Sequence, residues 1–130
     1  MSMESNLFAV SFSQSGTFVE GSLGPGGMYR LPVDATLVGV SFFAGGAGNV
    51  ALQLDVDEGD SRILDKVIPA GGYSATMFGR RDFGYATGQP PLFAPNQYPH
   101  ITKDHTVRML TNVESGTVYH ITVVFYFLAG

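Results

Sequence analysis

Residues Tyr119–Leu128 read YHITVVFYFL, and this stretch decides the fold class. Ten residues are too few to cross a bilayer as a helix, and the run is rich in β-branched and aromatic side chains, so it predicts a long β-strand. The odd-numbered residues, Tyr119 to Phe127, are all apolar, and we expect them to face a core. The even-numbered face becomes more apolar towards Tyr126 and Leu128. We therefore expect a neighbouring strand's side chains or another subunit to cover that end.

Shorter alternating runs extend this prediction along the chain. The pattern predicts strands over residues 7–13, 17–21, 35–44, 50–56, 62–68, 73–78 and 106–112. Glycine-rich turns separate them, and those at Gly45–Asn49 and Glu114–Gly116 are expected to close hairpins, as Gln14–Gly16 is expected to form a turn. The chain shows no convincing helix, no internal repeat and no domain boundary. An all-β antiparallel sandwich or barrel, with residues 1–130 as one domain, follows from this spacing.

Composition narrows the function classes. The 130 residues carry a net charge of −4 and contain no Cys, which excludes a disulfide framework and thiolate metal ligands. The basic residues are scattered, with only Arg80 and Arg81 adjacent, which argues against a nucleic-acid or anionic-membrane surface. No signal peptide and no apolar run of spanning length is present, so we expect neither nucleic acid nor membrane as a partner.

Motifs for chemistry are weak. Asp55–Asp60 fails as a calcium loop, because its fifth position is Gly59 and its twelfth is Lys66. His100, His105 and His120 form no metal-ligand pair, and no G-x-S-x-G nucleophile motif is present. The sequence does not exclude a pair of carboxylates for glycoside hydrolysis, because the distance between two such groups is set by the fold. The obvious acids share one turn, however, where solvation is the expected role. We predict no catalytic residue, cofactor or metal.

The stretch 79–97 is the most informative non-periodic segment. It is long for a loop in a compact domain, and its aromatic content argues against disorder. Apolar groups on such a loop cover either one open end of the sandwich or a partner's surface, and the two roles are compatible. The predicted interface comprises the apolar residues of this region, the two arginines at its rim and the end of the last strand: Arg80, Arg81, Phe83, Tyr85, Leu92, Phe93, Tyr98, Tyr126 and Leu128.

Two longer patterns carry a family resemblance. The first runs from Leu31-Pro32 through ATLVGV at residues 35–40 and LDVDEGDSRIL at residues 54–64 to the Ile68-Pro69 turn. The second is YPHITKDHTV at residues 98–107, followed by Gly116 and the apolar last strand. Both resemble small jelly-roll proteins and domains of tailed-bacteriophage virions. The match has two departures, since no Gly stands between Lys103 and Asp104, and Asp60 stands before Ser61.

The resemblance implies a jelly-roll β-sandwich of about eight strands. It also implies a non-enzymatic virion protein, most like a capsid cement or decoration protein, made in the host cytoplasm and bound to the capsid surface. Its partner would be the major capsid protein, and it would be a homo-oligomer, a dimer or a trimer. Residues 1–6 would form a flexible N-terminal arm that orders on the shell.

Other functions use the same fold. A tail, baseplate or head-fibre component is one alternative, and a carbohydrate-binding jelly-roll module is another. The absence of Trp, the preferred platform for sugar stacking, argues against the carbohydrate-binding module. A jelly-roll enzyme has no residue-level support, because fold alone does not grant function.

Overall fold

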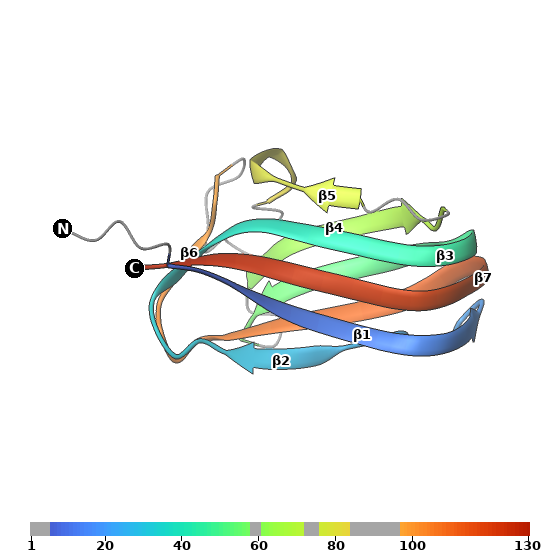
Figure 1. Cartoon of the computed structure of the whole chain (residues 1–130), viewed down its shortest axis with the longest axis horizontal. Coiled ribbons are helices and arrows are strands. Elements are labelled where there is room, and N and C mark those ends of the chain that lie inside the picture. The colour runs from blue at the N-terminus through green and yellow to red at the C-terminus, as the bar shows by residue number, and fades with distance from the viewer. Residues whose placement is uncertain (1–5, 58–60, 72–75, 84–96) are drawn as a thin grey trace.

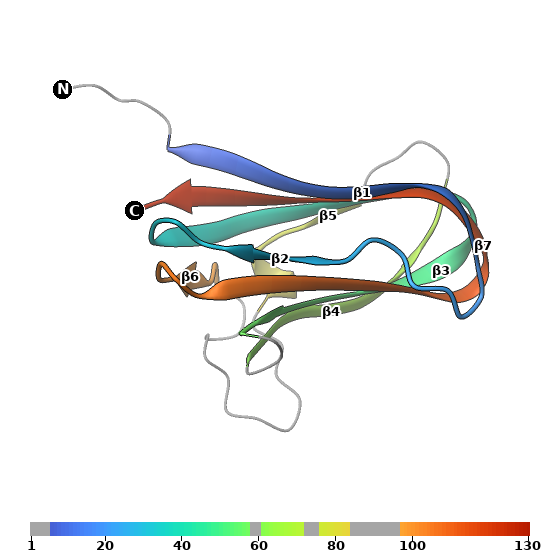
Figure 2. The same cartoon turned by 90° about the horizontal axis from the view of Figure 1, so that it is seen from below.

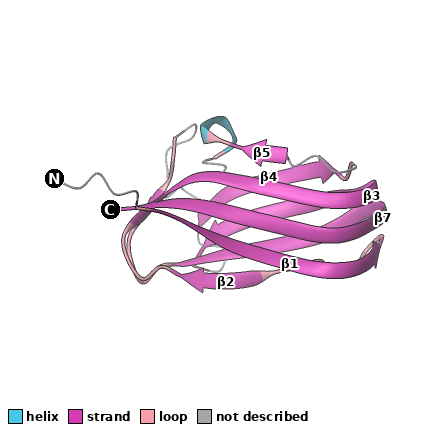
Figure 3. Ribbon diagram, viewed as in Figure 1, coloured by secondary structure: helices cyan, strands magenta, loops and turns pink. Residues whose placement is uncertain are grey.

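The computed structural model describes residues 6–57, 61–71, 76–83 and 97–130, and these residues are built almost entirely from β-strands (Figures 1 and 3). One turn of 3-10 helix, η1, spans Arg80–Asp82. The strands in chain order are β1 (Leu7–Val19), β2 (Gly27–Arg30), β3 (Ala35–Val56), β4 (Ser61–Pro69), β5 (Thr76–Phe78), β6 (His100–Ile101) and β7 (Thr106–Ala129).

The two longest strands, β3 and β7, pair antiparallel along their whole length and contribute to both layers of a sandwich. In one layer the order is β1, the second half of β7, the first half of β3, and then β5 and β6 along the edge of β3. In the other layer the order is β2, the first half of β7, the second half of β3, and β4. An antiparallel ribbon folded over into two layers with these flanking strands is a jelly roll. The sequence-based prediction of an all-β jelly-roll sandwich without a significant helix is confirmed.

The corner at which the ribbon passes from one layer to the other corrects two predicted hairpins. Gly45–Asn49 and Glu114–Gly116 do not reverse the chain but lie opposite one another within the continuous β3–β7 ladder, with Gly48 facing Gly116. Figure 2 shows β7 curving from one layer into the other at this end of the molecule. A Cβ on Gly48 would collide with the Ser115 carbonyl, and one on Gly116 would collide with the Ala47 carbonyl. Glycine therefore permits the close backbone approach of a sharp bend here.

Two irregularities account for further differences from the predicted pattern, while β2 and β6 are short strands that the pattern did not predict. The predicted turn at Gln14–Gly16 is a register shift inside the single strand β1. In β7, His120 has a positive φ of 52°, and such an irregularity shifts the two-residue period of the side chains. Tyr119, which was predicted to be in the core, is consequently 44% exposed. Beyond the bulge, the odd residues of β7 from Ile121 to Phe127 are fully buried, as expected.

The core lies between the two layers and is apolar. Its largest fully buried side chains come from both halves of the folded ribbon and include Phe42, Leu52, Leu54, Met109, Ile121, Phe125 and Phe127. The rings of Phe125 and Phe127 meet edge to face with centroids 6.4 Å apart, a favourable aromatic geometry. Because each inward residue alternates with an outward one, the same strands also determine the two outer faces of the sandwich.

Candidate interaction surface

The outer face of the layer that contains β1 carries no charged side chain in the part of the chain that the structure describes. Four cross-strand rows run over it, and among the described residues none of their outward-facing members is Lys, Arg, Asp or Glu. The members are small hydroxyl or apolar residues, joined by one Tyr and one His: Leu7, Ala9, Ser11 and Ser13 of β1; Thr122, Val124, Tyr126 and Leu128 of β7; Thr36, Ser41 and Phe43 of β3; Met77 of β5; and His100 of β6. We call this surface the uncharged face.

The uncharged face is most apolar at the end that holds the chain's C-terminus. Leu7 and Leu128 are directly opposite each other on β1 and β7 and are 53% and 46% exposed. Tyr126, one row further in, is half-buried, and its hydroxyl lies 3.3 Å from Ser41 Oγ. Large apolar side chains at this exposure remain available for contact with a partner.

The outer face of the other layer has a contrasting, charged composition. Its charged side chains come from all four strands and include Arg30, Asp55, Asp65 and Arg108, with Glu114 near the corner. Asp55 is fully buried although it points outward, because Arg108 lies across it: Nε donates to Oδ1 at 3.0 Å and a terminal nitrogen donates to Oδ2 at 2.8 Å. The sequence-based expectation that Asp55 is a solvated turn residue is therefore wrong.

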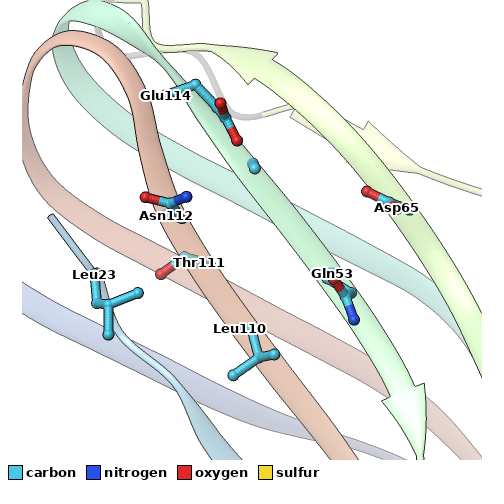
Figure 4. Close-up of a pocket in the computed structure, with 8 residues that line it drawn as sticks. Leu23, Gln53, Asp65, Leu110, Thr111, Asn112 and Glu114 are labelled. Atoms are coloured by element: carbon cyan, nitrogen blue, oxygen red, sulfur yellow. The ribbon is translucent and has the colours of Figure 1, made fainter. Parts of the chain in front are cut away.

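A groove of about 310 Å³ crosses this charged face (Figure 4). It is lined by apolar, amide and carboxylate side chains from β3, β4, β7 and the segment before β2, namely Leu23, Ala51, Gln53, Asp65, Leu110, Thr111, Asn112 and Glu114. No aromatic ring is among these lining residues, so the groove offers no platform on which a sugar ring could stack.

Comparisons with known proteins include two distant structural similarities. A chain of the "Cyanophage Pam1 capsid asymmetric unit" aligns with 98% of this chain at 17% sequence identity and a TM-score of 0.45, over 89% of its own length. A chain from the "Structure of infectious bursal disease virus Gx strain" aligns with 99% of this chain at 10% identity and a TM-score of 0.40, over 33% of its own length. No protein-family model matches the sequence, and no curated protein does either.

The predicted interface residues fall in three different places. Tyr126 and Leu128 lie on the uncharged face. Arg80 and Arg81 are exposed on η1 beyond the end of β5, and Tyr98 is exposed just before β6. Phe83 is only 2% exposed and packs in the core, so it has the lid role rather than a surface role in this chain. Tyr85, Leu92 and Phe93 lie outside the described residues, as do the first five residues of the predicted arm.

The uncharged face contains residues that the sequence-based prediction missed. Leu7 and Met77 are both more than half exposed, yet neither was among the predicted interface residues. The signal for Leu7 was present, because β1 alternates with Phe8, Val10 and Phe12 pointing inward, which turns Leu7 outward. The sequence held no such signal for Met77, because only the pairing of Met77 with Ser41 places it on the uncharged face.

The three histidines each have a separate partner in the structure. His100 Nδ1 lies 3.0 Å from Thr36 Oγ1, His120 Nδ1 accepts from the Gly16 N–H at 3.2 Å, and His105 Nδ1 lies 2.6 Å from Asp57 Oδ2. Within residues 6–57, 61–71, 76–83 and 97–130, no group of three or more potential metal-ligating side chains comes together. No helix in that part of the chain is long and apolar enough to span a membrane.

Proposed function

We propose that this chain is a non-enzymatic structural protein of a virus particle, specifically a bacteriophage capsid cement protein. It would bind the outside of the shell through the uncharged face and hold neighbouring major capsid subunits together. The observation that carries the proposal is the contrast between the two outer faces, one without charge and one with charges from every strand. The sequence resemblance to phage virion jelly rolls supports the choice of partner. The virion surface is the proposed location.

The uncharged face suits a shell-binding role for a physical reason. Interface cores are depleted of charged residues because a charge that loses water without gaining a partner costs free energy. Leu7, Leu128 and Tyr126 could be buried on it without that cost, and the hydroxyls of Ser11, Ser13 and Thr122 could hydrogen-bond backbone groups of the shell.

Cementing would follow from linkage. A protein that binds only the assembled shell stabilises it, and one that contacts two subunits at once opposes their separation. The exposed Arg80, Arg81 and Tyr98 would extend the contact beyond the β5–β6 edge of the layer. A homo-oligomer would multiply these contacts on a symmetric shell.

The test is a co-sedimentation assay with shells assembled from the major capsid protein of the virus that encodes this chain. We expect Leu128→Lys, which places a charge in the apolar end of the uncharged face, to weaken binding at least about tenfold. Val67→Lys is the matched control, because Val67 is 60% exposed on the charged outer face. It should leave binding unchanged.

Three results would contradict the proposal. Wild-type protein that does not sediment with the shells removes the capsid as partner. Equal losses for Leu128→Lys and Val67→Lys show that the uncharged face is not the contact. Specific binding to a glycan array by protein that ignores the shells would point to a carbohydrate-binding module instead.

A further inference from the structure

We propose that β1 is a self-pairing edge: two copies of the chain join their β1 strands antiparallel about a two-fold axis near Val10. This names the contact for the homo-oligomer of the proposed function and rests on that part of it, but not on capsid binding. The first observation is the position of β1, which ends the order of its layer and pairs only with β7 among the described strands. Figure 1 shows it along the margin of the layer.

The composition of β1 leaves this edge unprotected. Soluble proteins normally guard a long edge strand with charged side chains or Pro, because alternate residues point their N–H and C=O groups away from the sheet. The strand has 13 residues, LFAVSFSQSGTFV, and none is charged or Pro. Its one irregularity lies between Gln14 and Thr17, which leaves the stretch up to Ser13 regular.

The side chains beneath this edge are incompletely covered. Phe8, Val10 and Phe12 point into the sandwich and pack on the core, yet all three remain half-buried. Phe8 stacks on Phe127 with ring centroids 5.3 Å apart, and Phe12 contacts Phe125 at 5.5 Å. An additional strand along β1 would remove these rings from water as well as pair the backbone.

On the opposite side of the sandwich, side chains close the gap between the edges of the two layers, which we call the seam. There Phe78 and Phe83 are buried, and Lys66 of β4 reaches across the layers to Asp82 of η1 with 3.4 Å between Nζ and Oδ1. Beside β1, Gly27 and Tyr29 of β2 lie against the rings of Phe12 and Phe127, but among the described residues no ion pair joins β1 to the other layer. β2, the strand facing this seam from the other layer, has only four residues.

A second copy fits this edge by charge and by symmetry. The chain has a net charge of −4, so two copies repel unless they meet where charge is absent. A two-fold axis at Val10 pairs Phe8 with Phe12 of the second copy and Ala9 with Ser11, so every cross-strand pair is uncharged. Such an axis is perpendicular to the layer. Both uncharged faces would therefore point the same way and form one surface of double width.

The size of the contact predicts a reversible dimer. The regular part of β1 runs from Leu7 to Ser13, which is a normal strand length but a narrow interface. We expect sedimentation velocity of the full chain to show a dimer that dissociates on dilution. Hydrogen exchange of the amides between Phe8 and Ser13 that point away from β7 should slow as the concentration rises.

Charge substitutions on exposed positions test the pairing and its register. Ala9→Lys/Ser11→Lys places lysine opposite lysine and should raise the dissociation constant at least about tenfold. Ala9→Lys/Ser11→Glu places lysine opposite glutamate and should restore the dimer, which no effect on folding alone would do. Val67→Lys/Pro69→Lys adds the same charge on exposed positions of β4 and should dimerise like the wild type.

The outcomes separate this inference from the proposed function. A wild-type chain that is monomeric at every concentration, or trimeric, overturns it, as does a double-lysine variant that dimerises like the wild type. Leu128→Lys should keep the dimer while losing shell binding. If the dimer forms and no shell is bound, the pairing stands and the capsid proposal fails. If the chain stays monomeric and still binds shells, the pairing fails and the capsid proposal stands.

Discussion

At the scale of single residues, Asp57 and His105 form a contact that depends on pH. Asp57 directly follows β3 and has φ of 53°. Its carboxylate accepts from the Thr106 N–H at 3.1 Å and lies 2.6 Å from His105 Nδ1. Burial raises the pKa of the Asp57 carboxyl, but the hydrogen bonds from Thr106 and His105 and the charge of His105 outweigh it. The pKa is therefore below its usual value of 3.8.

This lowered pKa predicts acid sensitivity. The stabilising contribution of the Asp57 carboxylate is fully present above its unfolded-state pKa of 3.8 and is lost as pH falls through the lower folded-state pKa. Asp57→Asn should reduce the free energy of unfolding at pH 6 and flatten its decline below pH of about 4. Urea unfolding from pH 6 to pH 2 measures this. Asp104→Asn is the control, because its ion pair with Arg30 is exposed. Parallel pH profiles for Asp57→Asn and the wild type would refute the prediction.

The Arg108–Asp55 pair is a second prediction at the residue scale. Asp55 is fully buried, and two charge-assisted hydrogen bonds from Arg108 hold its carboxylate, with Gln53 as a further donor at 3.2 Å. Arg108→Ala should cost about 3 kcal/mol of unfolding free energy, because a buried carboxylate loses its cation. Arg30→Ala, at an exposed pair, should cost less than about 1 kcal/mol. Similar losses for the two variants in urea unfolding would contradict this.

At the scale of elements, the glycine corner of β3 and β7 decides whether the ribbon can fold over. Gly116 has φ of 74°, and its position against the Ala47 carbonyl leaves no room for a Cβ. Gly116→Ala should destabilise the fold by about 1–3 kcal/mol through backbone strain and the collision. The control is Gly71→Ala, because that Cβ would meet nothing within 4 Å. Thermal unfolding compares them, and equal melting temperatures would show that the corner tolerates a side chain.

At the scale of the whole molecule, the jelly roll separates three surfaces by charge. One outer face is uncharged, the other is charged, and the β1 edge lies at the margin of the uncharged face. This arrangement predicts that Leu128→Lys weakens shell binding and leaves self-pairing intact. Ala9→Lys/Ser11→Lys should weaken both, because Ala9 and Ser11 lie on the uncharged face as well as on the β1 edge. The charged face, with its groove, should tolerate Val67→Lys in both assays.

The sequence by itself determined the long strands, most of their inward faces and the sandwich class, because a period of two residues is written locally. It could not distinguish a hairpin from a bend at Gly45–Asn49 and Glu114–Gly116, since glycine permits both and the choice depends on a partner strand far along the chain. The same limit applied to Tyr119, which was expected in the core until the bulge at His120 turned it outward.

The candidate surface, like the fold, was predictable from the sequence only in part. Alternation in the last strand was enough to single out Tyr126 and Leu128, because their direction is a local property. The uncharged face as a whole, with Leu7 opposite Leu128 and Met77 opposite Ser41, exists only through the pairing of strands that are distant in sequence. Tertiary structure decided it, because the position of β1 beside β7, and of β5 beside β3, comes from burying one shared core rather than from any pattern within those strands.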